Sequence, residues 1–191
     1  MKAEEVIAAF RAAGALLEGH FVLSSGLHSS KYLQCALVLQ DPIQAEAFGR
    51  AIGSHFRNEG IQLVASPAIG GLIIGHEVAR SLGARFLWTE RELGRMTLRR
   101  GFTIAPGERT LVVEDVLTTG GSTRETIETL QAAGAHIVAA ASIIDRSSGA
   151  AEVGVPRISL AQLNVPSVPP EICDACKRGE VATKPGSRSS A

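Results

Sequence analysis

The amino-acid sequence predicts an α/β fold in which a central, mostly parallel β-sheet carries helices on both faces. A unit made of a helix-like segment, a glycine and a short apolar run recurs along the chain, with its glycines at Gly60, Gly83 and Gly134. A glycine just past the end of a helix takes the left-handed conformation that stops the helix. The apolar runs are continuous rather than alternating, which is typical of strands buried on both faces of a parallel sheet.

Each expected element has its own local signal. Near the N-terminus, Val6, Phe10, Ala13 and Leu17 fall on one face of a helix. Asp41 and Pro42 provide a cap and a first-turn proline for the next helix. Short apolar runs predict strands at residues 63–66, 85–89, 111–116 and 137–144. The segment 122–125 fits a capping box, so a helix is expected to begin directly after two glycines, whereas the end of the chain (182–191) is expected to be frayed.

Composition narrows the class of protein. The chain has 191 residues, of which 45% are hydrophobic, which suits one globular domain spanning residues 1–191. Its 19 basic and 19 acidic residues balance, which argues against a nucleic-acid partner. No apolar run approaches the roughly 20 residues of a membrane span, and the first residues lack the pattern of a signal peptide. We therefore expect a cytoplasmic protein without a membrane partner, and its three cysteines do not form a disulfide framework.

The segment LVVEDVLTTGGST, residues 111–123, carries the most specific chemistry. A buried strand leads into Glu114 and Asp115 and then into a turn rich in hydroxyls and glycine. Ligands of open α/β sheets bind at the carboxyl ends of strands, and the free N–H groups of a helix N-terminus bind phosphate. The two acids can accept hydrogen bonds from vicinal sugar hydroxyls or lie near a magnesium ion. The residues thus indicate a site for a ribose 5-phosphate, although ordinary strand-end acids and a simple turn are the alternative.

This segment resembles the phosphoribosyl-diphosphate signature of the type I phosphoribosyltransferases. The resemblance implies the fold of that family, with a small hood subdomain on the central sheet. It also implies that Glu114 and Asp115 hold the ribose hydroxyls of 5-phosphoribosyl 1-diphosphate (PRPP). The loop that follows would hold the 5-phosphate through Thr118, Thr119, Gly120, Gly121, Ser122 and Thr123. The implied cofactor is Mg²⁺, held mainly by substrate and water near the two acids, without a direct protein ligand.

Three further stretches resemble the orotate phosphoribosyltransferases within that family. FVLSSGLHSSKYLQ (21–34) is similar to their N-terminal signature, ASPAIGG (65–71) to the family's diphosphate loop, and SIIDRSSG to the place where an arginine pairs with the orotate carboxylate. Read without the resemblance, these stretches fit a simple hairpin, a strand-to-helix turn and a surface ion pair. The resemblance assigns the diphosphate to Gly70 and Gly71, and orotate to Ser24, Ser25, Gly26, Tyr32, Leu33, Thr118 and Arg146.

The resemblance also implies an activity and an organisation. The activity is that of a glycosyltransferase that moves a pentosyl group to orotate in pyrimidine biosynthesis. A purine phosphoribosyltransferase and a non-catalytic PRPP-binding regulator remain the alternatives. We expect a hood at about residues 1–40, a core at about 41–165 and a tail at about 166–191. By analogy with the family, the protein would be a homodimer.

One segment departs from the family pattern. Residues 89–102, TERELGRMTLRRGF, contain four arginines in place of the usual lysine and histidine. Like charges in a short loop repel one another unless an anion or nearby acids neutralise them, and a diphosphate is such an anion. We therefore assign PRPP binding and catalysis to Arg91 and Arg95, together with the catalytic Asp115. Glycines 94 and 101 would let the segment move as a lid shared across subunits, whereas a solvated hairpin is the alternative.

Two other family lysines are replaced, by Ser24 and Gly70, and Lys31 is out of register, so the cation that serves the diphosphate is not evident. In the tail, Cys173 and Cys176 have the spacing of half a zinc site. The chain has no second C-x-x-C, and we expect none of its histidines to form a ligand pair near the tail. The sequence therefore favours a structural or incidental role for the two cysteines, with a shared two-subunit site or a redox pair as alternatives.

Overall fold

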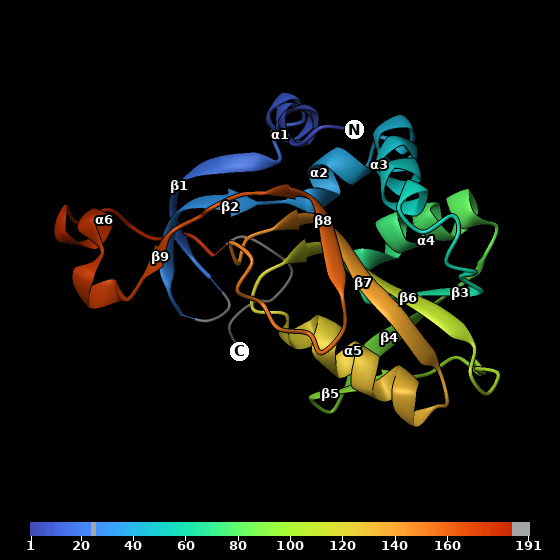
Figure 1. Cartoon of the computed structure of the whole chain (residues 1–191). Helices are drawn as coiled ribbons and strands as arrows, with labels where there is room; N and C mark the ends of the chain where they lie inside the picture. The colour runs from blue at the N-terminus through green and yellow to red at the C-terminus, as the bar shows by residue number, and fades with distance from the viewer. Residues whose placement is uncertain (24–25, 185–191) are drawn as a thin grey trace.

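A six-stranded sheet in the order β5-β4-β3-β6-β7-β8 runs through the centre of the protein (Figure 1). The computed structural model describes residues 1–23 and 26–184. All neighbouring strands in this sheet are parallel except the edge pair of β4 and β5. The four predicted strands are confirmed, and two edge strands join them. The strands are β3 (Leu63–Pro67), β4 (Arg85–Glu92), β5 (Arg95–Leu98), β6 (Arg109–Leu117), β7 (His136–Asp145) and β8 (Arg157–Gln162).

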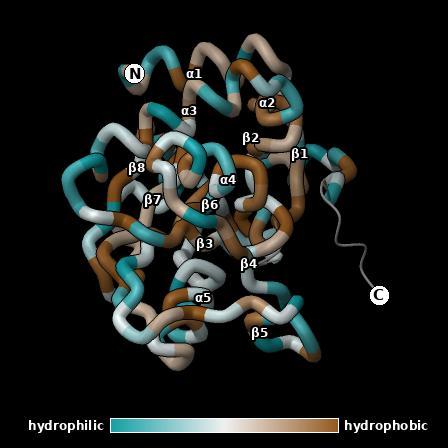
Figure 2. The backbone as a smooth tube through the Cα atoms, turned by 90° about the vertical axis from the view of Figure 1, so that its right-hand side faces the viewer, coloured by the Kyte–Doolittle hydropathy of each residue, from teal (hydrophilic) through white to brown (hydrophobic). Residues whose placement is uncertain are grey.

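Helices cover both faces of the sheet, as predicted. One apolar cluster joins the sheet to α1 (Ala3–Ala12), α2 (Cys35–Leu39), α3 (Pro42–Ser54) and α4 (Gly71–Leu82). The other lies under α5 (Gly121–Ala132), where Ile127 and Leu130 pack against β3 and β6. Figure 2 shows hydrophobic residues gathered in the middle of the fold, where β3, β6 and β7 run. Each large apolar side chain buried in this way contributes about 1.5–3 kcal/mol to folding.

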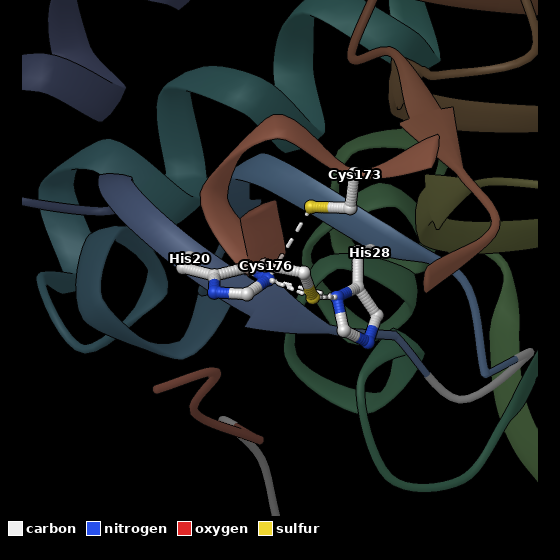
Figure 3. A group of neighbouring side chains, drawn as sticks. All are labelled: His20, His28, Cys173 and Cys176. Atoms are coloured by element: carbon white, nitrogen blue, oxygen red, sulfur yellow. Dashed lines mark hydrogen bonds between the residues drawn. The ribbon is translucent and has the colours of Figure 1, made fainter. Parts of the chain in front are cut away.

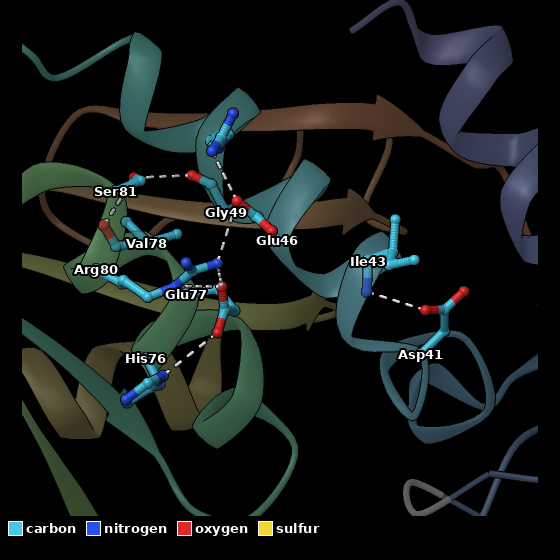
Figure 4. A network of polar contacts seen from close by, with 10 residues as sticks. Asp41, Ile43, Glu46, Gly49, His76, Glu77, Val78, Arg80 and Ser81 are labelled. Carbon is cyan, nitrogen blue, oxygen red and sulfur yellow. Dashed lines mark hydrogen bonds and ion pairs between the residues drawn. The ribbon is translucent and has the colours of Figure 1, made fainter.

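Helices α3 and α4 approach each other closely at Gly49. A Cβ atom at this position would lie 2.6 Å from the Cβ of Glu77. The missing side chain lets the Ser81 hydroxyl donate a hydrogen bond of 3.2 Å to the Gly49 carbonyl, and Arg80 bridges Glu77 and Glu46 beside it (Figure 4). This contact holds α4 in place, and the N-terminus of α4 forms part of the cavity described below.

Of the two helix caps predicted from local signals, one is confirmed and one is wrong. Asp41 accepts a hydrogen bond of 2.9 Å from the N–H of Ile43, so the predicted cap of α3 is confirmed. The capping box at residues 122–125 is wrong, because α5 begins one residue earlier and Gly120 is its N-cap, with a φ of 77° and no side-chain cap. Glu125 pairs instead with Arg91. The first helix ends before Leu17, which belongs to β1.

A smaller antiparallel sheet in the order β1-β2-β9 lies beside the central sheet. Its strands are β1 (Leu16–Val22), β2 (His28–Leu33) and β9 (Ser167–Val168), and the short helices η1 (Pro170–Ile172) and α6 (Asp174–Lys177) follow. The chain then returns along β1, where the Thr183 N–H donates to the His20 carbonyl and the Val22 N–H to the Thr183 carbonyl, both at 2.8 Å. The expected fraying is therefore wrong at Thr183. No helix in the described ranges has the length and apolar character to cross a membrane.

Candidate active site

A cavity of about 1190 Å³ opens between the small sheet and the carboxyl ends of the central strands. The carboxyl ends of parallel strands all meet at one edge of a sheet, which is where open α/β proteins bind their ligands. Residues from four separate stretches of the predicted site meet in its wall: Tyr32, Leu33, Gly70, Asp115, Thr118, Thr119 and Arg146. Ser24 and Ser25 lie outside the described residues.

The acidic pair lies near the end of β6, directly after four buried residues, Thr110 to Val113. Burial raises the pKa of Glu114 to about 7; a hydrogen bond from the Thr123 hydroxyl opposes this shift and the neighbouring Asp115 adds to it. Burial also raises the pKa of Asp115, against hydrogen bonds from the Val116 N–H and the Cys35 thiol. No lysine or arginine in the described ranges contributes to either shift. The pair therefore lacks the positive partner that buried carboxylates require, and ligand hydroxyls or a cation would favour its ionised form.

The turn between β6 and α5 has the geometry of an anion site. The first backbone hydrogen bond across this turn into the helix runs from the Arg124 N–H to the Gly120 carbonyl, so the N–H groups of residues 121–123 precede it. Such groups bind phosphate, helped by the helix dipole. Gly120 has a left-handed φ of 77°, and a Cβ there would lie 2.8 Å from Val153. The Thr123 hydroxyl is committed to Glu114, so only its backbone remains to face a ligand.

The loop after β3 lies directly against the acidic pair. A Cβ atom on Gly70 would come within 2.8 Å of both carboxylate oxygens of Asp115, and one on Gly71 would lie 3.0 Å from Ser66. Any side chain at position 70 would therefore displace Asp115 or be displaced by it. This close packing gives a physical reason why the lysine frequent in the family is absent here.

Arg146 follows β7 and lines the cavity. Burial lowers the pKa of its guanidinium, and its buried Nε has no hydrogen-bond partner in the described parts of the chain. Asp145 does not pair with it. Although burial disfavours the Asp145 carboxylate, hydrogen bonds from Ser147 and Arg157 hold its pKa below the ordinary value. The surface ion pair considered above for Arg146 is therefore wrong, and the side chain is an unsatisfied donor in the cavity wall.

The arginine-rich segment forms a regular hairpin of β4 and β5, whose turn residues Leu93 and Gly94 have φ values of 46° and 82°. Acids neutralise most of its charge: Arg91 pairs with Glu125 at 2.7 Å, while Arg99 and Arg100 both contact Glu90. For Arg95, the described ranges offer no ion pair. None of the four arginines is among the residues that line the cavity, so the roles of Arg91 and Arg95 stay predictions.

Sequence reasoning missed several parts of the cavity wall. Lys184 reaches it from the C-terminal segment that bonds to β1, and apolar side chains such as Leu23, Ile69 and Ile73 line it as well. Lys184 reaches the cavity only because the chain returns along β1. The residues next to it in the sequence therefore give no sign that it belongs to the site. Lys184 thus places a cation in the cavity wall at a position that does not correspond to the lysines of the family pattern.

Comparison with known proteins agrees with this geometry. Residues 38–165 match the family model described as the phosphoribosyl transferase domain, and the chain therefore belongs to the phosphoribosyltransferase family. Two orotate phosphoribosyltransferases are close relatives: that of Pelotomaculum thermopropionicum is 52% identical, covering 98% of this chain and 99% of the relative, and that of Thermotoga petrophila is 51% identical, covering 92% and 94%. The crystal structure of orotate phosphoribosyltransferase from Aeropyrum pernix has a TM-score of 0.68 at 30% identity, covering 83% of this chain and 93% of that one. Within its family, the chain belongs with the orotate phosphoribosyltransferases.

The expectation that no histidine pair lies near the tail cysteines is wrong. His20 and His28, on adjacent strands of the small sheet, lie beside Cys173 and Cys176. The histidine pair is distant in sequence from the cysteine pair, with 153 positions between His20 and Cys173, and only the docking of α6 beside β1 and β2 brings the two pairs together.

Proposed function

We propose that this chain transfers the 5-phosphoribosyl group from PRPP to orotate, giving orotidine 5′-monophosphate and diphosphate in pyrimidine biosynthesis. One observation carries the proposal: a single cavity joins Asp115, Thr118 and Thr119 of the β6–α5 segment to Arg146, whose buried Nε has no acceptor among the described residues. The close relatives that bear the name of orotate phosphoribosyltransferase support the same reaction.

In this proposal, the β6–α5 segment binds the ribose 5-phosphate. Asp115 and Glu114 accept hydrogen bonds from the ribose hydroxyls, and their ionised forms become favoured when the hydroxyls donate. The N–H groups of residues 121–123 and the hydroxyls of Thr118, Thr119 and Ser122 hold the 5-phosphate. The backbone of Gly70 and Gly71 faces the diphosphate. Holding both ends of the sugar in this way brings the anomeric carbon and the attacking nitrogen together, which can contribute several kcal/mol to catalysis.

Orotate would lie against Arg146, whose guanidinium can bind its carboxylate through two parallel hydrogen bonds. Tyr32 and Leu33 would cover the ring from the small sheet, with Gly26 and the preceding serines closing over it. Burial disfavours the charge of Arg146, and its Nε has no acceptor in the part of the chain that the structure describes, so a carboxylate ligand would relieve this cost. A neutral purine base cannot do so, which favours orotate over the purine alternative.

The residues present also fit magnesium. Glu114 and Asp115 offer oxygen ligands, and their raised pKa values would fall beside a cation. In the described ranges, these acids are not part of any group of three or more side chains that could share an ion. This agrees with an ion held mainly by PRPP and water. When bound, magnesium would neutralise charge that develops on the leaving diphosphate.

Arg95 would act on the diphosphate of the neighbouring subunit in a homodimer. Its hairpin is anchored to α5 through Arg91 and through the Thr129 hydroxyl, which donates to the Met96 carbonyl. Arg95→Ala should then lower turnover much more than it weakens orotate binding, with Arg99→Ala, whose side chain already has acidic partners, as the matched control.

A mixing experiment tests whether the arginine acts across subunits. Arg95→Ala and Asp115→Asn should each be nearly inactive alone. If one subunit supplies the arginine and the other the acid, unfolding and refolding the two together should restore about a quarter of the wild-type activity, because random pairing leaves that share of sites intact. No recovery in mixed dimers of confirmed composition would contradict this arrangement.

The reaction itself is tested by release of diphosphate from PRPP by the purified protein with magnesium. Orotate should support turnover, whereas adenine, hypoxanthine and xanthine should not. Turnover with a purine base in place of orotate would favour the purine alternative, and PRPP binding without turnover would favour a regulator. Fractionation of the native cells would test the expected cytoplasmic location.

A further inference from the structure

We propose that His20, His28, Cys173 and Cys176 together bind one zinc ion, which fastens the C-terminal segment to the small sheet (Figure 3). The four side chains lie outside the cavity wall described above. Metal content can be measured without any reference to turnover, so this proposal stands or falls independently of the proposed reaction.

The distances between the ligand atoms match one tetrahedral ion. Zinc binds histidine nitrogen at about 2.0–2.1 Å and cysteine sulfur at about 2.3 Å, so a tetrahedron has N···S edges of about 3.6 Å and an N···N edge of about 3.4 Å. The His20 Nε2 atom lies 3.5 Å from the Cys173 sulfur and 3.7 Å from the Cys176 sulfur, and the His28 Nδ1 atom lies 3.2 Å from the latter. The two ring nitrogens are 2.8 Å apart, and all four ligand atoms lie within 4.8 Å of one another. Shifts of less than about 1 Å would accommodate an ion.

A backbone carbonyl orients His20 in the way that a metal ligand requires. The Nδ1 atom of His20 lies 2.9 Å from the Glu180 carbonyl, which can only accept a hydrogen bond. The proton of the neutral ring is therefore on Nδ1, and the lone pair of Nε2 points into the cluster. A backbone carbonyl behind a histidine commonly fixes the tautomer of a zinc ligand in this way.

The fold itself creates the cluster. Val22 lies opposite His28 in the antiparallel pair of β1 and β2, and His20 precedes Val22 by two residues, so the pairing brings the two histidine rings within 2.8 Å of each other. A bulge between Glu18 and Phe21 shifts the register beside His20, and bulges often re-aim a side chain next to a functional site. Cys173 is the N-cap of α6 and Cys176 is its third residue, and both sulfurs face the Nε2 atom of His20.

Burial and ligand number point to a structural ion. His20, His28 and Cys173 are 7%, 8% and 6% exposed, respectively. Two nitrogens and two sulfurs complete a tetrahedral shell and leave no open position for a substrate, which distinguishes structural from catalytic zinc. The ion would join residues as far apart as 156 positions, so it would close a very long loop. It would also hold the segment that pairs with β1 and delivers Lys184 to the cavity; this last consequence rests on the proposed function.

The first test is the metal content of the purified, reduced protein, reloaded with zinc and dialysed. We expect about one zinc per chain by inductively coupled plasma mass spectrometry, and loss of it in Cys173→Ser/Cys176→Ser and in His20→Asn. Cys35→Ser and His136→Gln, which remove a cysteine and a histidine outside the cluster, should retain the metal. Less than a tenth of an equivalent in wild type, or equal zinc in all variants, would overturn the proposal.

The second test uses the wild-type chain alone, so it survives if the variants fail to fold. Cobalt substituted for zinc should give intense visible bands of tetrahedral geometry together with thiolate-to-cobalt charge transfer. Removing zinc with a zinc-selective chelator should lower Tm by about 5–10 °C relative to protein with zinc at a hundredfold excess over its Kd. Two results would overturn the zinc proposal. One is a disulfide between Cys173 and Cys176 in protein that never takes up metal, and the other is the weak cobalt bands of an octahedral site.

Discussion

Removing the charge of Glu114 should make the ligand-free protein more stable at alkaline pH. The pKa of this carboxyl is raised from 4.5 to about 7, mainly by burial. Between these values the folded protein holds a proton that the unfolded chain has released, so stability falls as the pH rises through this window. At 1.36 kcal/mol per pH unit, the full difference corresponds to about 3 kcal/mol, an upper value because the side chain remains partly exposed. Glu114→Gln has no such proton to lose and can still accept the hydrogen bond from Thr123.

The measurement is thermal and urea unfolding of wild type and Glu114→Gln between pH 4.5 and 8.5, without magnesium or PRPP. The two proteins should be nearly equal in stability at pH 4.5. The free energy of unfolding of the variant should rise relative to that of wild type until about pH 7. Above that pH the variant should stay more stable by up to about 3 kcal/mol, or about 5–10 °C in Tm. Adding magnesium and PRPP should reduce or reverse this lead, because the ionised acid of wild type then has partners. A variant that is less stable than wild type at pH 8, or a difference that does not change with pH, would refute the reasoning.

Glu90 provides a control in which the pKa is shifted in the opposite direction, so its effect on stability changes with pH in the opposite sense. A hydrogen bond from Arg100 and a second from Trp88 lower its pKa to about 2. The stabilisation that ionised Glu90 gives to the folded protein is therefore fully present above pH 4.5, the pKa of the unfolded chain. It is lost only as the pH falls towards 2. Glu90→Gln should be less stable than wild type at pH 8, and the difference should shrink with acidification.

Three further substitutions test individual contacts. Arg146→Ala should raise the KM for orotate by about 10–100-fold with little change in the KM for PRPP, because a charge-assisted pair contributes about 1.5–3 kcal/mol; equal effects in steady-state kinetics on both substrates would contradict its assignment. Gly75→Ala would place a Cβ 2.0 Å from the buried Ser66 hydroxyl, so urea unfolding should show a loss of about 1–3 kcal/mol, and an unchanged midpoint would show that the helix can shift. Gly70→Ala would put a methyl group 2.8 Å from the Asp115 oxygens, so kcat/KM for PRPP should fall roughly tenfold while Tm hardly changes; full activity would mean that Asp115 can move without cost.

The central sheet could be predicted from the sequence because its signals are local. Continuous apolar runs such as 111–116, and glycines such as Gly83 with a φ of 66°, record the burial of a strand and the end of a helix within a few residues. The β6–α5 segment is of the same kind, since its acids, hydroxyls and glycines adjoin one another. The predicted capping box did not form; Glu125, in α5, pairs instead with Arg91, which lies on β4 and is distant in sequence.

What the sequence determined by itself is the strand–helix alternation and the presence of one acid-and-glycine segment at the end of a buried strand. Only the tertiary structure decided that Asp145 pairs with Arg157 while the Arg146 Nε has no acceptor among residues 1–23 and 26–184, that Lys184 reaches the cavity, and that two histidines meet two cysteines. Backbone preference and hydrophobic periodicity act between neighbours, so the linear pattern records them. Contacts between distant side chains depend on strand register and on how the chain ends dock, and these follow from the packing of the whole domain.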